Sequence, residues 1–183
     1  DLSKRYVRAL SNMISCQIDL GHFDRSKVMI EELKNSAKMG GFNRTDIQVN
    51  IFKDSQIGEL KICHQTGDFE KGLRIVDEVI ESLEDWSGLL HKEQELEFFY
   101  HIAYIYFGAG KYNKALFWIN KVLNDNENTL RQDLYSYARL FNLVIHFELA
   151  NYDLLEYITK STQRYLHKRQ RDFEFEKLVI DMI

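Results

Sequence analysis

The sequence predicts an all-α protein built from a stacked helical repeat. Apolar residues recur at intervals of three and four along the 183 residues, which is the spacing that gives an α-helix one apolar face. The chain has no proline and only nine glycines, so helix-breaking residues are scarce. At the same point of the helical pattern, between two apolar-periodic segments, a small residue precedes an aromatic residue by two positions four times: Gly21-His22-Phe23, Gly67-Asp68-Phe69, Gly110-Lys111-Tyr112 and Ala150-Asn151-Tyr152. The intervals of 46, 43 and 40 residues are typical of helical repeats.

Nine helices are expected, with boundaries uncertain by about two to four residues. They cover residues 2–20, 24–38, 46–66, 69–84, 91–109, 112–124, 130–149, 152–168 and 170–183. Gly40 and Gly41 can end the second helix through a left-handed cap. Thr45 and Gln48 have the spacing of a capping box, in which each side chain satisfies a free amide at the helix start. This box opens the second helix pair.

The third pair contains a segment whose composition fits either a helix or a buried strand. Residues 98–107 (FFYHIAYIYF) have high strand propensity, and a buried strand would give a similar run. A helix is favoured because the acidic stretch 93–97 leads into it without a break, which brings its length to about 17 residues. A helix that is apolar on nearly every side should lie in the middle of the stack.

The fourth pair opens with a second capping box, from Thr129 to Gln132, and the last helix follows it. The helices therefore group into repeats at about 2–40, 45–85, 91–126 and 130–168, with a capping helix at 170–183. Together they form a single domain over residues 1–183. Because the chain starts at Asp1 and ends at Ile183 inside a helical pattern, we expect it to be part of a longer protein.

The charge of the chain argues against nucleic acid as a partner. The formal net charge is −4 and the pI is about 5.9, whereas a nucleic-acid binder usually carries a basic excess or a basic stripe. The basic run from Arg164 to Arg171 lies near the end of the chain and is interpreted as a solvated helix terminus.

The sequence also predicts neither a membrane span nor a secreted disulfide-bonded protein. The longest stretch without a formal charge, residues 98–110, is too short to cross a bilayer, and no signal peptide is present. Cys16 and Cys63 do not make a disulfide framework. We expect them to be buried reduced thiols in a cytoplasmic protein.

No motif predicts catalysis, a metal or a cofactor. The chain lacks a glycine-rich phosphate loop, HExxH and GxSxG, and no two histidines stand three or four positions apart. Cys63 and His64 are adjacent in sequence, so they point to different faces of a helix. Glu93, Glu95 and Glu97 stand beside a helix start, where they complement the helix dipole. We therefore expect no catalytic residues, no metal, no cofactor and no enzymatic activity.

The third repeat resembles the tetratricopeptide repeat, a helix–turn–helix unit. Its large, small and aromatic positions follow the order and spacing of that family: Phe99, Ala103, Tyr106, Gly110, Tyr112, Ala115, Ile119 and Val122. The resemblance implies a right-handed α-solenoid of about four antiparallel helix pairs plus a C-terminal helix. Two features depart from the family: the period exceeds its usual ~34 residues, and the proline that commonly closes a repeat is absent. The closest match is to divergent, lengthened repeats.

The resemblance further implies a concave groove lined by the first helix of each pair. Its partner-binding residues would be Arg8, Lys61, His64, Glu97, Tyr100, Tyr104 and Tyr137. The same helix faces would also present Ser11, Ser15, Asp54, Ile57, Phe107, Leu140 and Val144. The aromatic residues have two interpretations. The tyrosines fit equally well as anchors for a partner or as core residues of lengthened helices. For Phe107, Leu140 and Val144 the core interpretation is favoured over the groove.

The function that these features predict is a non-enzymatic module that binds a protein or peptide through the concave face of a helical repeat. An alternative is a regulatory domain that senses a peptide or small ligand for an effector domain elsewhere in a longer protein. A third alternative, an all-α enzyme, would need convergent acids or histidines in a deep pocket. The sequence identifies neither the partner nor the oligomeric state.

Overall fold

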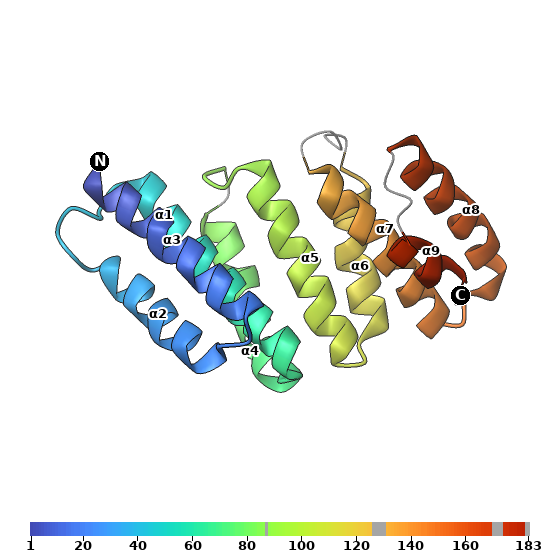
Figure 1. Ribbon diagram of the computed structural model, residues 1–183, viewed down its shortest axis with the longest axis horizontal. Helices are drawn as coiled ribbons and strands as arrows, with labels where there is room; N and C mark the ends of the chain where they lie inside the picture. Colours follow the sequence, from blue (N-terminus) through green and yellow to red (C-terminus); the bar gives the residue numbers. More distant parts are fainter. Residues whose placement is uncertain (87, 126–130, 170–173, 182–183) are drawn as a thin grey trace. The chain divides into compact units, whose positions relative to one another are not determined.

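The computed structural model describes residues 1–86, 88–125, 131–169 and 174–181, and in these ranges every regular element is an α-helix (Figure 1). The helices are α1 (Leu2–Asp19), α2 (Phe23–Ser36), α3 (Thr45–Thr66), α4 (Phe69–Asp85), α5 (Lys92–Gly108), α6 (Tyr112–Leu123), α7 (Gln132–Glu148), α8 (Tyr152–Lys168) and α9 (Glu174–Asp181). The all-α prediction is confirmed for the described residues.

The predicted helix ranges agree with the observed ones. The first eight helices begin and end within two residues of the predicted positions. Residues 98–107 belong to the continuous helix α5, so the helical interpretation of this segment is confirmed. The last predicted helix, 170–183, contains α9, and its residues 170–173 and 182–183 lie outside the described part of the chain.

The four repeated small residues all adopt a left-handed backbone conformation at the end of a helix. The φ angles are 74° at Gly21, 74° at Gly67, 70° at Gly110 and 54° at Ala150. After each one, the next backbone N–H donates to a carbonyl five residues back: His22 to Gln17, Asp68 to Cys63, Lys111 to Tyr106 and Asn151 to His146, at 2.8–3.0 Å. This is the pattern of a Schellman cap, and it explains why the sequence places glycine or alanine there.

Two predicted helix signals are wrong. Helix α3 begins at Thr45 itself, and the Gln48 amide donates instead to the carbonyls of Ala37 and Phe42, at 2.9 Å each. Gln48 therefore fastens the connection between α2 and α3 rather than closing a capping box. Gly40 and Gly41 do not cap α2, because that helix ends at Ser36 with a right-handed cap residue. Thr129, the first residue of the second predicted box, lies outside the described residues.

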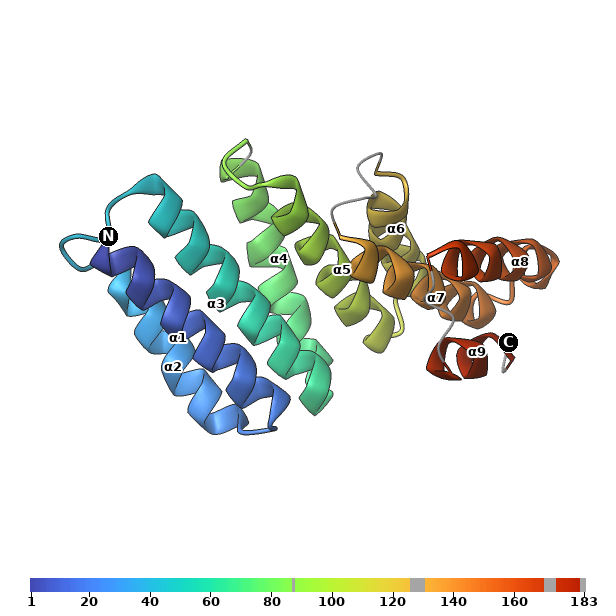
Figure 2. The same ribbon diagram turned by 45° about the horizontal axis from the view of Figure 1, so that its top comes forward.

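The chain forms two compact units, residues 1–94 and 95–183. In the first unit, α1, α2 and α3 pack against one another and α4 packs on α3 (Figures 1 and 2). Their apolar faces enclose a core that includes Ile14, Ile18, Ile30, Leu33 and Ile47. The three-and-four spacing of these residues is what makes the helices pack in this way.

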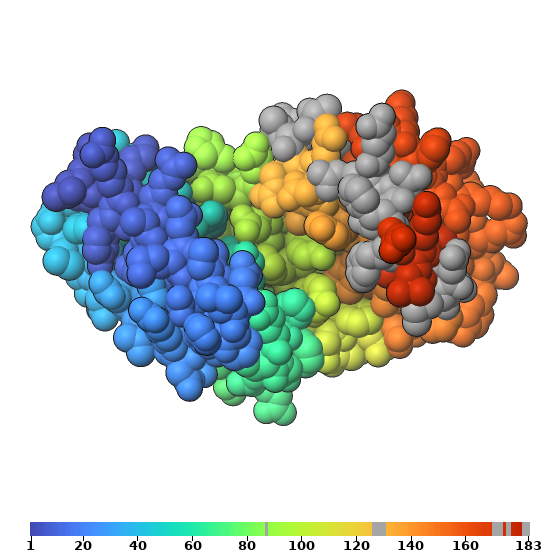
Figure 3. All heavy atoms as spheres, viewed as in Figure 1, coloured from blue at the N-terminus to red at the C-terminus, as the bar shows by residue number. Residues whose placement is uncertain are grey.

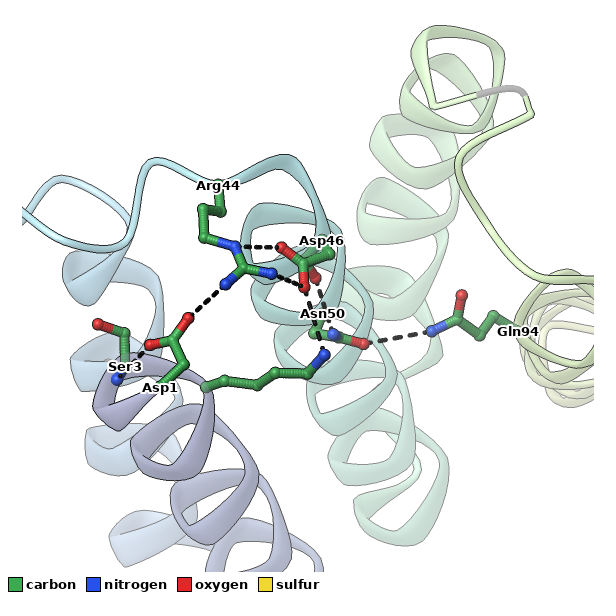
Figure 4. Close-up of polar contacts among 7 residues, drawn as sticks. Asp1, Ser3, Arg44, Asp46, Asn50 and Gln94 are labelled. Atoms are coloured by element: carbon green, nitrogen blue, oxygen red, sulfur yellow. Dashed lines mark hydrogen bonds and ion pairs between the residues drawn. The ribbon is translucent and has the colours of Figure 1, made fainter.

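A polar network joins the N-terminal ends of helices in the first unit (Figure 4). The Arg44 guanidinium pairs with Asp1 at 2.7 Å and with Asp46 at 3.0 Å, while Lys4 pairs with Asp46 at 3.3 Å. Desolvation raises the pKa of Asp46, but the hydrogen bonds and charges of Lys4 and Arg44 outweigh it and lower the pKa. The network holds the start of α1 against the start of α3.

In the second unit, α7 packs against α6, α8 and α9. Figure 2 shows α8 and α9 on either side of the α7 ribbon. Leu140 and Leu143 of α7 form a buried cluster with Leu155, Leu166 and Ile180 from α8 and α9. Residues from Glu95 onward of α5 also belong to this unit, and Phe98, Ile102 and Ile105 on that helix are fully buried.

Candidate partner-binding site

The second unit carries a cluster of aromatic side chains on α5 and α7. Tyr100, Tyr104 and Phe107 are spaced four and three residues apart, so they lie on one face of α5. All three contact Phe141 of α7, with ring-centroid distances of 6.1, 5.0 and 5.2 Å respectively. Tyr137 stands one turn before Phe141 on α7. These five residues are called the aromatic cluster below.

Exposure within the aromatic cluster increases from its base to its edge. Phe141 is 8% exposed, Tyr100, Tyr104 and Phe107 are half-buried, and Tyr137 is 47% exposed. The ring of Tyr104 stacks on Phe141 with an interplanar angle of 26°. The cluster therefore has a fixed base and an accessible edge.

The hydroxyl of Tyr100 stays protonated through the physiological pH range. Burial raises its pKa far above the usual value of 10, and the neighbouring Tyr104 and Tyr137 add to the shift. The cluster thus presents neutral rings with polar hydroxyls, a combination suited to a surface that is partly apolar and partly wet.

Charged residues lie beside the aromatic cluster. Glu97, one turn before Tyr100 on α5, pairs with Arg131 at 4.0 Å. Arg131 also pairs with Asp133 at 3.2 Å. Desolvation raises the pKa of Asp133, but the hydrogen bond and charge of Arg131 outweigh this and lower it. Glu97, Arg131 and Asp133 are therefore a linked group of charges near the start of α7.

The structure brings together part of the predicted groove. Glu97, Tyr100, Tyr104 and Tyr137 lie in the second unit, on α5 and α7. Arg8, Lys61 and His64 belong to the first unit, with Arg8 on α1 and the other two on α3. Arg8 is exposed, while Lys61 and His64 are half-buried, and burial lowers the pKa of His64.

Two predictions about exposure are wrong. Ile57, expected on the groove, is 5% exposed. Leu140, for which core packing was the favoured interpretation, is 4% exposed because it packs into the α7–α8–α9 cluster. Cys16, expected to be buried, is exposed, whereas Cys63 is buried as predicted. Phe107 and Val144 are half-buried, which is intermediate between the exposure expected of a groove residue and that expected of a core residue.

Phe141, which contacts three residues of the cluster, is absent from the predicted site. Its position four residues after Tyr137 places it on the same face of α7, so helical spacing could have identified it. Its contacts with α5 depend on tertiary packing, which no spacing rule provides.

The described residues carry no sign of metal chemistry or of a membrane span. Within the ranges given above, no group of three or more His, Cys, Asp or Glu side chains is arranged to hold a metal ion. No helix in the described part of the chain is long and apolar enough to cross a membrane.

Comparisons with protein-family models, curated proteins and solved structures find no match to this chain. The resemblance to tetratricopeptide repeats therefore rests on the residues quoted above.

Proposed function

We propose that the chain is a non-enzymatic interaction module that binds a protein or peptide partner through the aromatic cluster of its second unit. The observation that carries this proposal is the gradient of exposure from Phe141, which is 8% exposed, to Tyr137, which is 47% exposed. A packed base fixes the rings before binding, and an accessible edge leaves area for a partner to cover.

The chemistry of the cluster suits a partner with an apolar anchor. Aromatic side chains bury a large area with few rotatable bonds, so they lose little conformational entropy on binding. Tyrosine is also enriched among the residues that dominate binding energy in protein interfaces. The neighbouring charges of Glu97, Arg131 and Asp133 would contribute to the polar rim that surrounds such an anchor.

We also propose a repeat family and a cellular location for the protein. We assign the chain to the tetratricopeptide-like repeats, with antiparallel helix pairs and right-handed stacking. The support is the sequence pattern together with four helix ends that share one cap geometry. The free thiols of Cys16 and Cys63 favour a cytoplasmic location.

The proposal is tested by affinity capture with three forms of the protein. The wild type is compared with the double variant Tyr104→Ala/Tyr137→Ala, which removes two rings of the cluster. The control is Tyr157→Ala, because Tyr157 is a 70% exposed tyrosine on α8 outside the cluster. Circular dichroism and thermal melting verify that each variant is folded.

The proposed site is supported if wild type and the control retain a partner that the double variant loses. A partner that all three forms retain equally would place the binding surface elsewhere. Failure of wild type to capture any partner would count against an interaction module.

A further inference from the structure

Helix α1 has two apolar stripes, and only one of them faces the core. The first stripe, Val7, Leu10, Ile14 and Ile18, is buried against the other helices of the first unit. The second stripe is exposed and consists of Leu2, Tyr6, Ala9, Met13 and Cys16, continued by the right-handed cap residue Leu20 directly after the helix. Leu2 is 84%, Met13 49% and Leu20 65% exposed. Figure 3 shows α1 uncovered on the face of the first unit toward the viewer.

The exposed stripe has the spacing of a coiled-coil seam. Its members follow one another at intervals of four, three, four, three and four residues, the a and d positions of a heptad pattern. The pattern is also symmetric about residue 11. A second α1 laid antiparallel would therefore place Leu2 opposite Leu20, Tyr6 opposite Cys16, and Ala9 opposite Met13.

The residues beside the stripe also form complementary pairs in this arrangement. In heptad terms Arg5, Asn12 and Asp19 occupy the g positions along one edge of the stripe. An antiparallel second copy would bring its Asp19 beside Arg5, and its Asn12 beside Asn12. Both Arg5 and Asp19 are exposed, and no salt bridge involves either side chain within the described residues. Two ion pairs would thus form across the seam, one at each end.

The surface next to the stripe can adapt to a packed helix. A groove of about 380 Å³ runs between α1 and α2, with Tyr6, Leu10, Met13 and Met29 among its lining residues. Arg25 and Glu32 of α2 also line it, and the Tyr6 hydroxyl donates to Glu32 at 2.6 Å. The unbranched methionine side chains can change rotamer to fill gaps against an incoming helix.

We propose that α1 is the seam of a homodimer in which two copies of this chain pack α1 against α1 in antiparallel orientation. The two-fold axis passes near residue 11, so each copy contributes the same six apolar residues and the same two charges. An interface of this kind is self-complementary and closed, because the same patch is used on both subunits.

The charge pairs give the sharpest test. Sedimentation equilibrium of the 183-residue chain should show a concentration-dependent mass that rises from 21.8 kDa toward twice that value. Arg5→Glu would face Asp19 of the second copy, and Asp19→Arg would face its Arg5, so each single change creates two repulsive pairs. We expect each to weaken dimerisation by roughly tenfold or more. The double variant Arg5→Glu/Asp19→Arg restores opposite charges and should return the dissociation constant to within about threefold of wild type.

A cross-linking experiment tests the register independently. In Tyr6→Cys the introduced thiol faces the native Cys16 of the second copy, so oxidation with copper phenanthroline should give a covalent dimer on a non-reducing gel. The matched control Tyr6→Cys/Cys16→Ser should stay monomeric on the same gel. Cys63 does not interfere because it is buried.

Several results would overturn the homodimer. One is a wild-type chain that stays monomeric up to a concentration of about 100 μM, a range in which weak dimers are detected. Another is a dimer that both single charge variants leave unchanged, or that the double variant does not restore. A folded monomer whose Tyr6→Cys form does not cross-link would assign the stripe to a helix of a different protein.

Discussion

At the scale of single residues, Ala150 stands out because it performs the role that glycine performs at the equivalent turns. Its φ of 54° is the one positive value at a non-glycine position among the described residues. A side chain in the left-handed region places Cβ too close to the following carbonyl oxygen, which costs roughly 1–2 kcal/mol. The turn after α7 is therefore strained in a way that the turn after α5 is not.

This strain predicts opposite effects for two substitutions. Ala150→Gly should raise the free energy of unfolding by about 1 kcal/mol, and Gly110→Ala should lower it by about the same amount. A methyl group at Gly110 would meet no atom within 4 Å beyond the adjacent residues of the chain, so the expected loss comes from the local backbone alone. Urea denaturation of both variants measures the effects. Stabilisation by Gly110→Ala would contradict the assigned backbone geometry.

His146 makes the stability of the second unit dependent on pH. Burial lowers the pKa of His146 below its usual value of 6.5. The Asn151 amide nitrogen, which can only donate, lies 3.0 Å from Nδ1, so the ring accepts this bond in its neutral form. Between the lowered pKa and 6.5 the unfolded chain binds more protons than the folded chain. Stability therefore falls as the pH drops below 6.5.

The contribution of His146 is measured by comparing wild type with His146→Gln. Free energies of unfolding at pH values of about 7.5 and 5.5 bracket the transition. Wild type should lose stability on acidification, and the variant should lose less. The variant should keep some dependence, because burial lowers the pKa of His64 as well. Identical losses in the two proteins would remove His146 as a source of the pH effect.

At the scale of elements, the close approach of α6 to its neighbours depends on a small side chain. Ala115 on α6 is fully buried, with no exposed surface. Ala115→Leu would add three carbon atoms at this contact and should destabilise the protein by about 1–3 kcal/mol through overpacking. Thermal melting measures the loss, and Asn113→Leu, an exposed site on the same helix, is the control. Equal melting temperatures for Ala115→Leu and wild type would show that α6 is not held closely at this position.

The helices could be predicted from the sequence because their signals are local. A three-and-four apolar pattern and a scarcity of breakers determine where α1 to α8 lie, within two residues. The start of α3 shows where local reasoning fails. Gln48 matches a capping box, but carbonyls 11 and 6 residues before it in the chain bind its amide instead. A spacing rule does not take into account competing hydrogen-bond partners outside the motif.

Exposure was harder to predict than helix position. Cys16 and Ile57 both lie on helices that carry apolar residues on more than one face. On such helices, spacing identifies the apolar stripes but not which stripe is covered. Tertiary packing covers Ile57 and leaves Cys16 open.

At the scale of the whole molecule, the chain contains two compact units, each with its own buried residues. The candidate site could be predicted in part, because Tyr100, Tyr104 and Tyr137 follow from helical spacing. The buried base of the site, Phe141, could not be predicted. It contacts three residues of α5 only when α5 and α7 are packed together. The proposed partner site belongs to the second unit and the α1 seam to the first.

Binding at the aromatic cluster is tested most directly by the affinity of the captured partner for Tyr137→Ala, determined by isothermal titration calorimetry beside wild type and Tyr157→Ala. Tyr137 is 47% exposed, so its removal should leave the fold intact. We expect Tyr137→Ala to weaken binding by about tenfold or more, because it removes an aromatic anchor, while Tyr157→Ala should match wild type. Equal dissociation constants for all three proteins would contradict a binding site at the aromatic cluster.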